Sequence, residues 1–137
     1  MLEALDGELL MPDSPAYDAV RAAHDPAFAD VRPAYVVRCA SEADVVRTLA
    51  FARESGLPVV PRGGGHSFVG NSSTSGILLD LSLLSFVEWE DETVARIGAG
   101  ARLGHVYAEL HRVGRTLPAG CGETVGIAGL SSEVDGA

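Results

Sequence analysis

One segment of the chain concentrates residues that can do chemistry, Arg62-Gly-Gly-Gly-His-Ser67. Three consecutive glycines cost backbone entropy, but without Cβ atoms they allow the main chain to approach a ligand closely. Successive N–H groups can then converge into a nest suited to phosphate or pyrophosphate. His66 and Ser67 add a nucleophilic imidazole and a hydroxyl. The segment predicts either an anion-binding site beside a nucleophile or a tight turn followed by a surface histidine.

Two familiar phosphate motifs do not fit the chain. Residues 65–72 have the spacing of a P-loop, but Asn71 stands where that motif needs lysine. Residues 98–104 resemble a dinucleotide-binding fingerprint, but one residue too many precedes the last glycine. That segment also follows a predicted hairpin, whereas the fingerprint lies within a βαβ unit.

The elements before the triglycine segment place it at the edge of a sheet. Residues 35–39 predict a strand, and a helix then begins at the cap residue Ser41 and ends at Gly56. Residues 58–61 predict a second strand, and a β-α-β unit of this length implies parallel strands. Open α/β sheets bind ligands at the carboxyl ends of such strands, which is where His66 falls.

The elements after this segment are a buried strand, a hairpin and a helix. Residues 77–81 are apolar enough for a buried strand, and residues 86–90 and 93–97 predict a hairpin. Residues 103–113 predict an amphipathic helix with an apolar stripe of Val106, Leu110 and Val113. A glycine-rich segment over residues 120–129 follows, and polar residues end the chain.

The composition excludes several classes of protein. The chain has 137 residues, with 10 Lys+Arg against 19 Asp+Glu, and every one of those cations is arginine. A lysine Schiff base is therefore impossible, and a net charge of −9 argues against nucleic-acid and anionic-membrane partners. Two cysteines do not make a disulfide scaffold. The acidic start is unlike a signal peptide, and together these features predict a soluble, cytoplasmic protein.

The residues resemble a known family. Arg62–Ser67 is similar to the flavin-attachment segment of FAD-linked oxidases of the vanillyl-alcohol oxidase / p-cresol methylhydroxylase superfamily, in its berberine-bridge-enzyme-like branch. Further segments follow in the same order as in that family, namely residues 32–39, 41–46, 77–81, 98–101 and 124–130. The resemblance covers residues 17–130.

The resemblance implies a fold and a division of the chain. The fold class is α+β with an α/β-type start, a p-cresol methylhydroxylase-type FAD-binding fold with its first βαβ subdomain and the beginning of its second. Residues 1–33 form an N-terminal helical and irregular segment, and residues 34–130 form a partial FAD-binding domain. Residues 131–137 depart from the family pattern as a C-terminal tail, so the domain is expected to be truncated.

The resemblance also implies the cofactor and its contacts. FAD is the expected cofactor, held by a covalent bond from the His66 imidazole to the 8α-methyl group of the flavin. The expected cofactor-binding residues are Arg62, Gly63, Gly64, Gly65, His66, Ser67, Gly70, Cys121, Thr124, Val125, Gly126 and Gly129. No catalytic residue is expected within this chain, because the family's general base and most of its substrate pocket come from later segments.

Cys121 has two interpretations. Some members of the family form a second covalent bond from a cysteine three residues before the Val-Gly pair. Cys121 lies four residues before Val125, so it either bonds the flavin through a bulged loop or is a small residue packing near the ring. Cys39, within a predicted strand, is expected in the core. No metal site is expected, because no two histidines have helical ligand spacing.

Three functions remain open. The first is the FAD-binding part of an oxidoreductase that takes hydride from an alcohol, sugar or similar C–H donor, inactive by itself without the substrate domain. The second is a non-catalytic or remnant α/β module that has lost cofactor binding through truncation. The third is a relative that binds FAD without a covalent bond, against which the histidine in Gly-Gly-His-Ser argues.

Overall fold

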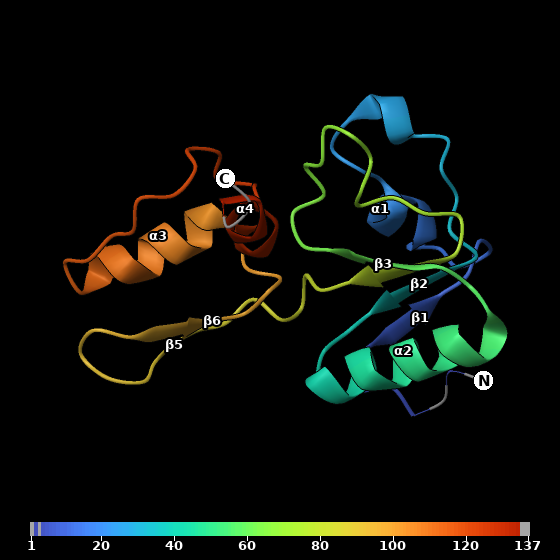
Figure 1. Ribbon diagram of the computed structural model, residues 1–137, viewed down its shortest axis with the longest axis horizontal. Coiled ribbons are helices and arrows are strands. Elements are labelled where there is room, and N and C mark those ends of the chain that lie inside the picture. Colours follow the sequence, from blue (N-terminus) through green and yellow to red (C-terminus); the bar gives the residue numbers. More distant parts are fainter. Residues whose placement is uncertain (1, 3, 135–137) are drawn as a thin grey trace.

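The computed structural model describes residues 2 and 4–134, which form two lobes (Figure 1). The first lobe is built on a four-stranded sheet in the order β1-β2-β4-β3, and the second on the two-stranded sheet β5-β6. The elements of the first lobe are β1 (Glu8–Leu10), α1 (Tyr17–Arg21), the 3-10 helix η1 (Pro26–Phe28), β2 (Tyr35–Arg38), α2 (Glu42–Ser55), β3 (Val59–Arg62) and β4 (Ile77–Asp80). The second lobe contains β5 (Val87–Trp89), β6 (Ala95–Ile97), α3 (Leu103–Arg112) and α4 (Ile127–Val134).

The predicted parallel β-α-β arrangement is confirmed. Both β2 and β3 run parallel to β4, which lies between them. All four residues of β4 are buried, as expected for a central strand covered on both faces. The antiparallel edge strand β1 pairs with β2 and was not predicted, since three residues within an irregular segment are too short for a recognisable alternation.

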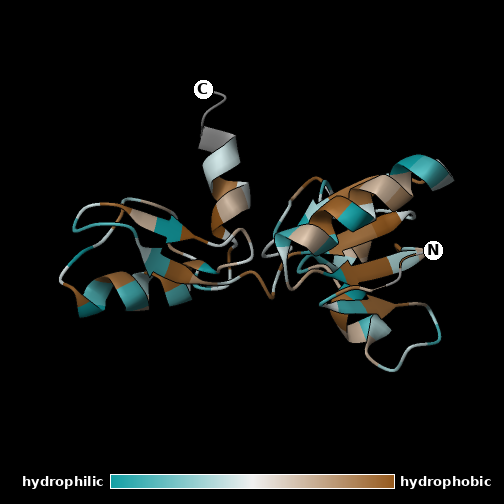
Figure 2. Ribbon diagram, turned by 90° about the horizontal axis from the view of Figure 1, so that it is seen from below, coloured by the Kyte–Doolittle hydropathy of each residue, from teal (hydrophilic) through white to brown (hydrophobic). Residues whose placement is uncertain are grey.

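Side-chain alternation divides the core of the first lobe between the two faces of this sheet. Val37 and Leu79 pack in a cluster with Ala52 of α2, whereas Val36 and Leu78 pack in a cluster with Tyr17 of α1. Figure 1 shows α1 and α2 on opposite faces of the sheet, and Figure 2 shows that the strands carry mostly hydrophobic residues. The sheet therefore holds the loops at its carboxyl edge on a rigid support.

Helix α2 begins and ends at the predicted caps. The Ser41 side chain accepts a hydrogen bond from the N–H of Asp44, and Gly56 ends the helix with φ +67°. Asp44 is fully buried, and its carboxylate accepts N–H groups of Asp6, Gly7 and Ala40 at 2.9–3.0 Å. Burial alone would raise the pKa of Asp44, but these donors outweigh it and lower the pKa. The carboxylate thereby joins the N-terminal segment to α2.

The second lobe packs its hairpin against α3 and the start of α4. Val106 and Leu110 of α3 are buried in a cluster with Ala101, and Ile97 and Ile127 pack against it. Val113 was predicted on the same stripe, but α3 ends at Arg112 and Val113 is 53% exposed. Helix α4 continues to Val134, past the boundary proposed at residue 130. That domain boundary stays a prediction.

The mixture of a mainly parallel sheet, a separate hairpin and flanking helices confirms the α+β class with an α/β-type start. No helix among the described residues has both the length and the apolar character needed to cross a bilayer.

Candidate functional site

The triglycine loop, residues 63–76, joins the carboxyl end of β3 to β4, as the sequence predicts. At its base, Arg62 is buried, and burial lowers the pKa of its guanidinium. This guanidinium donates to the carbonyl oxygens of Arg21 at 2.7 Å and Ala22 at 3.2 Å, next to the end of α1. It also donates to the carbonyl oxygen of Ser72 at 2.9 Å. The Arg62 side chain therefore ties the loop to α1.

The triglycine loop touches a second loop, residues 113–126 between α3 and α4, through glycine backbones. A Cβ atom on Gly64 would overlap the amide nitrogen of Gly126, and a Cβ atom on Gly126 would overlap the amide nitrogen of Gly64. Gly63 is similarly close to the carbonyl oxygen of Ala99, which precedes α3. The absence of side chains at these positions is what permits the two lobes to meet here.

The loop backbone offers a run of donors. Among the described residues, no N–H group from Gly63 to Gly70 donates a hydrogen bond to a protein acceptor. Gly65 and Gly70 have φ of +74° and +78°, which turn the chain within this run. Successive free N–H groups around such turns form a cradle for anions. A pyrophosphate-containing cofactor fits this donor set.

His66 lies at the junction of the two loops. Its Nε2 atom is 2.9 Å from Oγ1 of Thr124, which belongs to the second loop. The ring is only partly buried and Thr124 is exposed, so the pair faces outward from the junction. The structure thus brings together two predicted site residues that are far apart in the sequence.

Charges around His66 favour its neutral form. Burial, then His24 and Arg102, lower the pKa of His66, and hydrogen bonding to the backbone of Thr124 raises it. His24 stacks on the ring with 4.0 Å between ring centroids, and Arg102 is the residue directly before α3. A neutral imidazole keeps one nitrogen lone pair free to act as a nucleophile.

The other predicted site residues lie around this junction in different settings. The Ser67 hydroxyl accepts the N–H of Asn71 at 3.0 Å and so stabilises the loop. Gly70 packs against the Phe28 ring. Cys121 is exposed, and Gly129 lies in the first turn of α4. Val125 is half-buried, and its carbonyl oxygen accepts a hydrogen bond from the N–H of Leu103. Among the described residues, no hydrogen bond joins Cys121 to His66.

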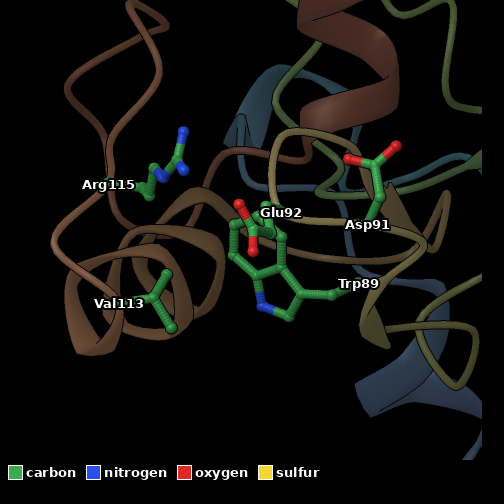
Figure 3. Close-up of a pocket in the computed structure, with 5 residues that line it drawn as sticks. All are labelled: Trp89, Asp91, Glu92, Val113 and Arg115. Carbon is green, nitrogen blue, oxygen red and sulfur yellow. The ribbon is translucent and has the colours of Figure 1, made fainter.

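A second feature is an open cavity of about 360 Å³ in the second lobe, lined by Trp89, Asp91, Glu92, Val113 and Arg115. Figure 3 shows the Trp89 indole beside Glu92, with Val113 and Arg115 across the opening. None of the predicted cofactor residues lines it. Its mixed charges and absence of a free donor run do not suit a dinucleotide. The described residues also contain no group of three or more potential metal ligands.

Two residues of the site were missed by sequence reasoning. His24 lies among loop prolines, and Arg102 belongs to no motif assigned a role in the sequence. His24 stacks on His66, and the charge of Arg102, which pairs with Gly126 in an isolated β-bridge, acts on its pKa. Both effects arise from the packing of separate segments, and no local pattern in the chain signals either one.

Comparison with known proteins identifies the family of the chain. The family described as FAD binding domain matches residues 33–137. An FAD-linked oxidoreductase of Bacillus subtilis is 36% identical over 129 residues, which are 93% of this chain and 28% of the relative. The (R)-6-hydroxynicotine oxidase of Paenarthrobacter nicotinovorans is 32% identical over 130 residues, again 93% of this chain and 28% of the relative.

Solved structures agree with the sequence matches. The crystal structure of 6-hydroxy-D-nicotine oxidase from Arthrobacter nicotinovorans superposes with a TM-score of 0.85 at 32% identity, covering 92% of this chain and 28% of that one. BBE-like 1 of Physcomitrella patens gives a TM-score of 0.84 at 30% identity, covering 93% and 29%. These neighbours confirm the p-cresol methylhydroxylase-type fold, and the chain spans less than a third of their length. Because the family match extends over most of the sequence, this chain belongs to the FAD-binding-domain family of FAD-linked oxidoreductases.

Proposed function

We propose that this chain is the FAD-binding part of an oxidoreductase that oxidises an alcohol, sugar or similar C–H donor, with the flavin covalently held by His66. Bound FAD supplies the two-electron acceptor for a hydride from the substrate. The observation that carries the proposal is the position of His66. It is placed between a run of free backbone donors and Thr124, with Nε2 2.9 Å from the hydroxyl oxygen.

Different residues of the chain would bind different parts of the cofactor. The N–H groups from Gly63 to Gly70 would bind the pyrophosphate, and the Gly64–Gly126 contact keeps the second loop against the first. Thr124 and Val125 would line the flavin from the second loop. The free donors offer hydrogen bonds to an anion without any lysine, which this sequence lacks.

His66 would form the covalent bond through Nδ1. With its proton on Nε2, the ring donates to Thr124 Oγ1, which leaves the Nδ1 lone pair free. In the net reaction, the imidazole loses its ring proton and gains a bond to C8α, whose methyl group loses one hydrogen. Formation of this bond would release two electrons and two protons, which dioxygen would take up as hydrogen peroxide. The neutral state favoured around His66 suits this role.

The expected role of the chain in turnover rests on the fraction of its relatives' length that it covers. It spans 28% of the first two relatives described above, so substrate recognition by a full-length protein rests on segments outside it. We expect this chain alone to hold flavin and to lack turnover. The competing function is a remnant α/β module without cofactor binding, and the non-covalent FAD protein is the other alternative.

The deciding experiment is an intact-mass measurement with in-gel flavin fluorescence after denaturation. Wild type, His66→Ala and the control His111→Ala would be expressed with ample riboflavin. His111 is an exposed residue of α3, so its loss tests for effects of histidine removal in general. We expect one covalent FAD in wild type and His111→Ala, and none in His66→Ala.

Each alternative has its own outcome in this experiment. A yellow chromophore that denaturation releases from wild type would favour non-covalent FAD binding. A bare-chain mass with no bound chromophore before denaturation would favour the remnant module. Fluorescence that survives denaturation in His66→Ala would assign the covalent bond to another residue, with Cys121→Ser as the next variant to test.

A further inference from the structure

A second histidine is held against the proposed attachment residue. The His24 ring stacks on the His66 ring, with centroids 4.0 Å apart and ring planes inclined by 30°. The main-chain N–H of His24 donates to the carbonyl oxygen of Gly65 at 3.1 Å. The two residues are therefore joined by a side-chain contact and, one residue earlier, by a backbone hydrogen bond.

The segment that carries His24 is anchored on both sides. Two residues earlier, the Ala22 carbonyl oxygen accepts the Arg62 guanidinium at 3.2 Å. One residue later, the Asp25 carboxylate accepts the N–H of Ala27 at 2.8 Å and caps η1. These contacts leave the backbone at His24 little freedom. The position of the His24 ring is thus set by a restrained backbone as well as by its own side-chain conformation.

We propose that His24 is a positioning residue for His66, which holds the plane of that imidazole in the orientation needed for flavin attachment; this role rests on the covalent bond proposed above. Thr124 restrains one edge of the ring through Nε2, and His24 covers one face. An edge contact and a face contact together prevent rotation of the ring about its Cβ–Cγ bond. His24 acts through His66 and is not assigned a contact with the flavin.

The stacked pair also resists protonation of His66. Two charged imidazoles at this separation would repel one another, so a charge on His24 disfavours a charge on His66. The other groups acting on the ring are Arg102, whose charge has the same effect, and the backbone of Thr124, whose hydrogen bonding opposes it. Burial adds to the lowering of the pKa of His66.

The test measures the rate of covalent flavin attachment in the full 137-residue chain. Apo protein is mixed with excess FAD, samples are denatured at intervals, and covalent fluorescence is measured for wild type, His24→Ala, His24→Phe and the control His111→Phe. A lost aromatic stack predicts attachment about threefold to tenfold slower in His24→Ala. His24→Phe, which keeps a flat ring, should stay near wild type. Equal rates in wild type and His24→Ala would overturn the positioning role.

A second measurement does not require flavin. The ring signals of His66 are followed by NMR against pH in the apo chain, with His66→Gln used to assign them. In His24→Phe the pKa of His66 should rise toward its usual 6.5, because one repelling charge is removed. In His24→Ala the ring shifts should also move, since the stacked neighbour is gone. Absence of covalent flavin in wild type would overturn the attachment itself, whereas unchanged His66 signals in His24→Ala would overturn the stacking role.

Discussion

The Oγ1 atom of Thr124 lies 2.9 Å from Nε2 of His66, so a residue of the second loop holds the imidazole of the first. This contact crosses the junction between the two lobes. It depends on the close approach of Gly64 and Gly126, which brings the loops together beside it. The orientation of the predicted nucleophile is therefore a property of the junction and not of the triglycine loop alone.

Replacing Thr124 tests this contact directly. Thr124→Val keeps the shape of the side chain but removes the hydroxyl, so we expect covalent flavin attachment to slow about fivefold, the effect of losing a hydrogen bond of about 1 kcal/mol. Thr124→Ser retains the hydroxyl and should react at close to the wild-type rate. The measurement is the time course of fluorescence that survives denaturation. Identical rates for Val and Ser variants would contradict a role for the hydrogen bond.

The pH dependence of attachment should reflect the charge on His66. Only the neutral ring is nucleophilic, so the rate should fall as the pH is lowered through the pKa of His66. Burial, His24 and Arg102 lower that pKa, which places the midpoint below the usual 6.5. Arg102→Gln removes one positive charge, and the midpoint should then move to higher pH. Arg53→Gln, an exposed change on α2, serves as the control and should leave the midpoint unchanged.

A side chain at the contact between Gly64 and Gly126 should destabilise the protein. In Gly126→Ala the new methyl group meets the amide nitrogen of Gly64, and overpacking of this kind costs about 2 kcal/mol. Gly129→Ala is the matched control, because a Cβ atom there has nothing within 4 Å and alanine favours a helix. Thermal unfolding of the apo chains measures the difference. A melting temperature for Gly126→Ala at or above that of Gly129→Ala would refute the close approach.

The Arg62 side chain is expected to stabilise the fold of the triglycine loop. Arg62→Met leaves the carbonyl oxygens of Arg21, Ala22 and Ser72 without their donor, so we expect a loss of about 2 kcal/mol in the free energy of unfolding. Urea unfolding followed by circular dichroism measures this loss. Arg53→Met, at an exposed position on α2, should change the unfolding free energy by less than about 0.5 kcal/mol. Equal stabilities of the two variants would disprove the tie to α1.

The two cysteines should differ in reactivity. Cys39 is fully buried, and burial, followed by the nearby charge of Asp44, raises the pKa of its thiol to about 11. Because the thiolate is the reactive form, iodoacetamide at pH 8 should label the exposed Cys121 and leave Cys39 unmodified. Mass spectrometry of the peptides measures each site, and urea should expose Cys39. Rapid labelling of Cys39 in the native chain would contradict its place in the core.

Local patterns in the sequence were enough to predict most of the elements around the site. The Ser41 cap and the Gly56 terminus are decided by neighbouring residues, and each lies where it was predicted. The apolar strand predicted over residues 77–81 is found as β4, Ile77–Asp80. Cys39 was likewise correctly assigned to the core. The short strand β1 was missed, because its stability comes from pairing with β2 rather than from its own three residues.

The sequence by itself determined that a triglycine turn and a histidine follow a parallel strand, because glycine content and strand periodicity are local properties. Only the tertiary structure decided which groups surround that histidine. His24 and Thr124 contact His66, and the charge of Arg102 acts on its pKa. These three residues come from separate segments, which are brought together by loop packing that has no sequence period. The Arg62 side chain likewise points toward α1, where it donates to the carbonyl oxygens of Arg21 and Ala22. These partly buried carbonyl groups gain that donor only once the sheet and α1 are packed together.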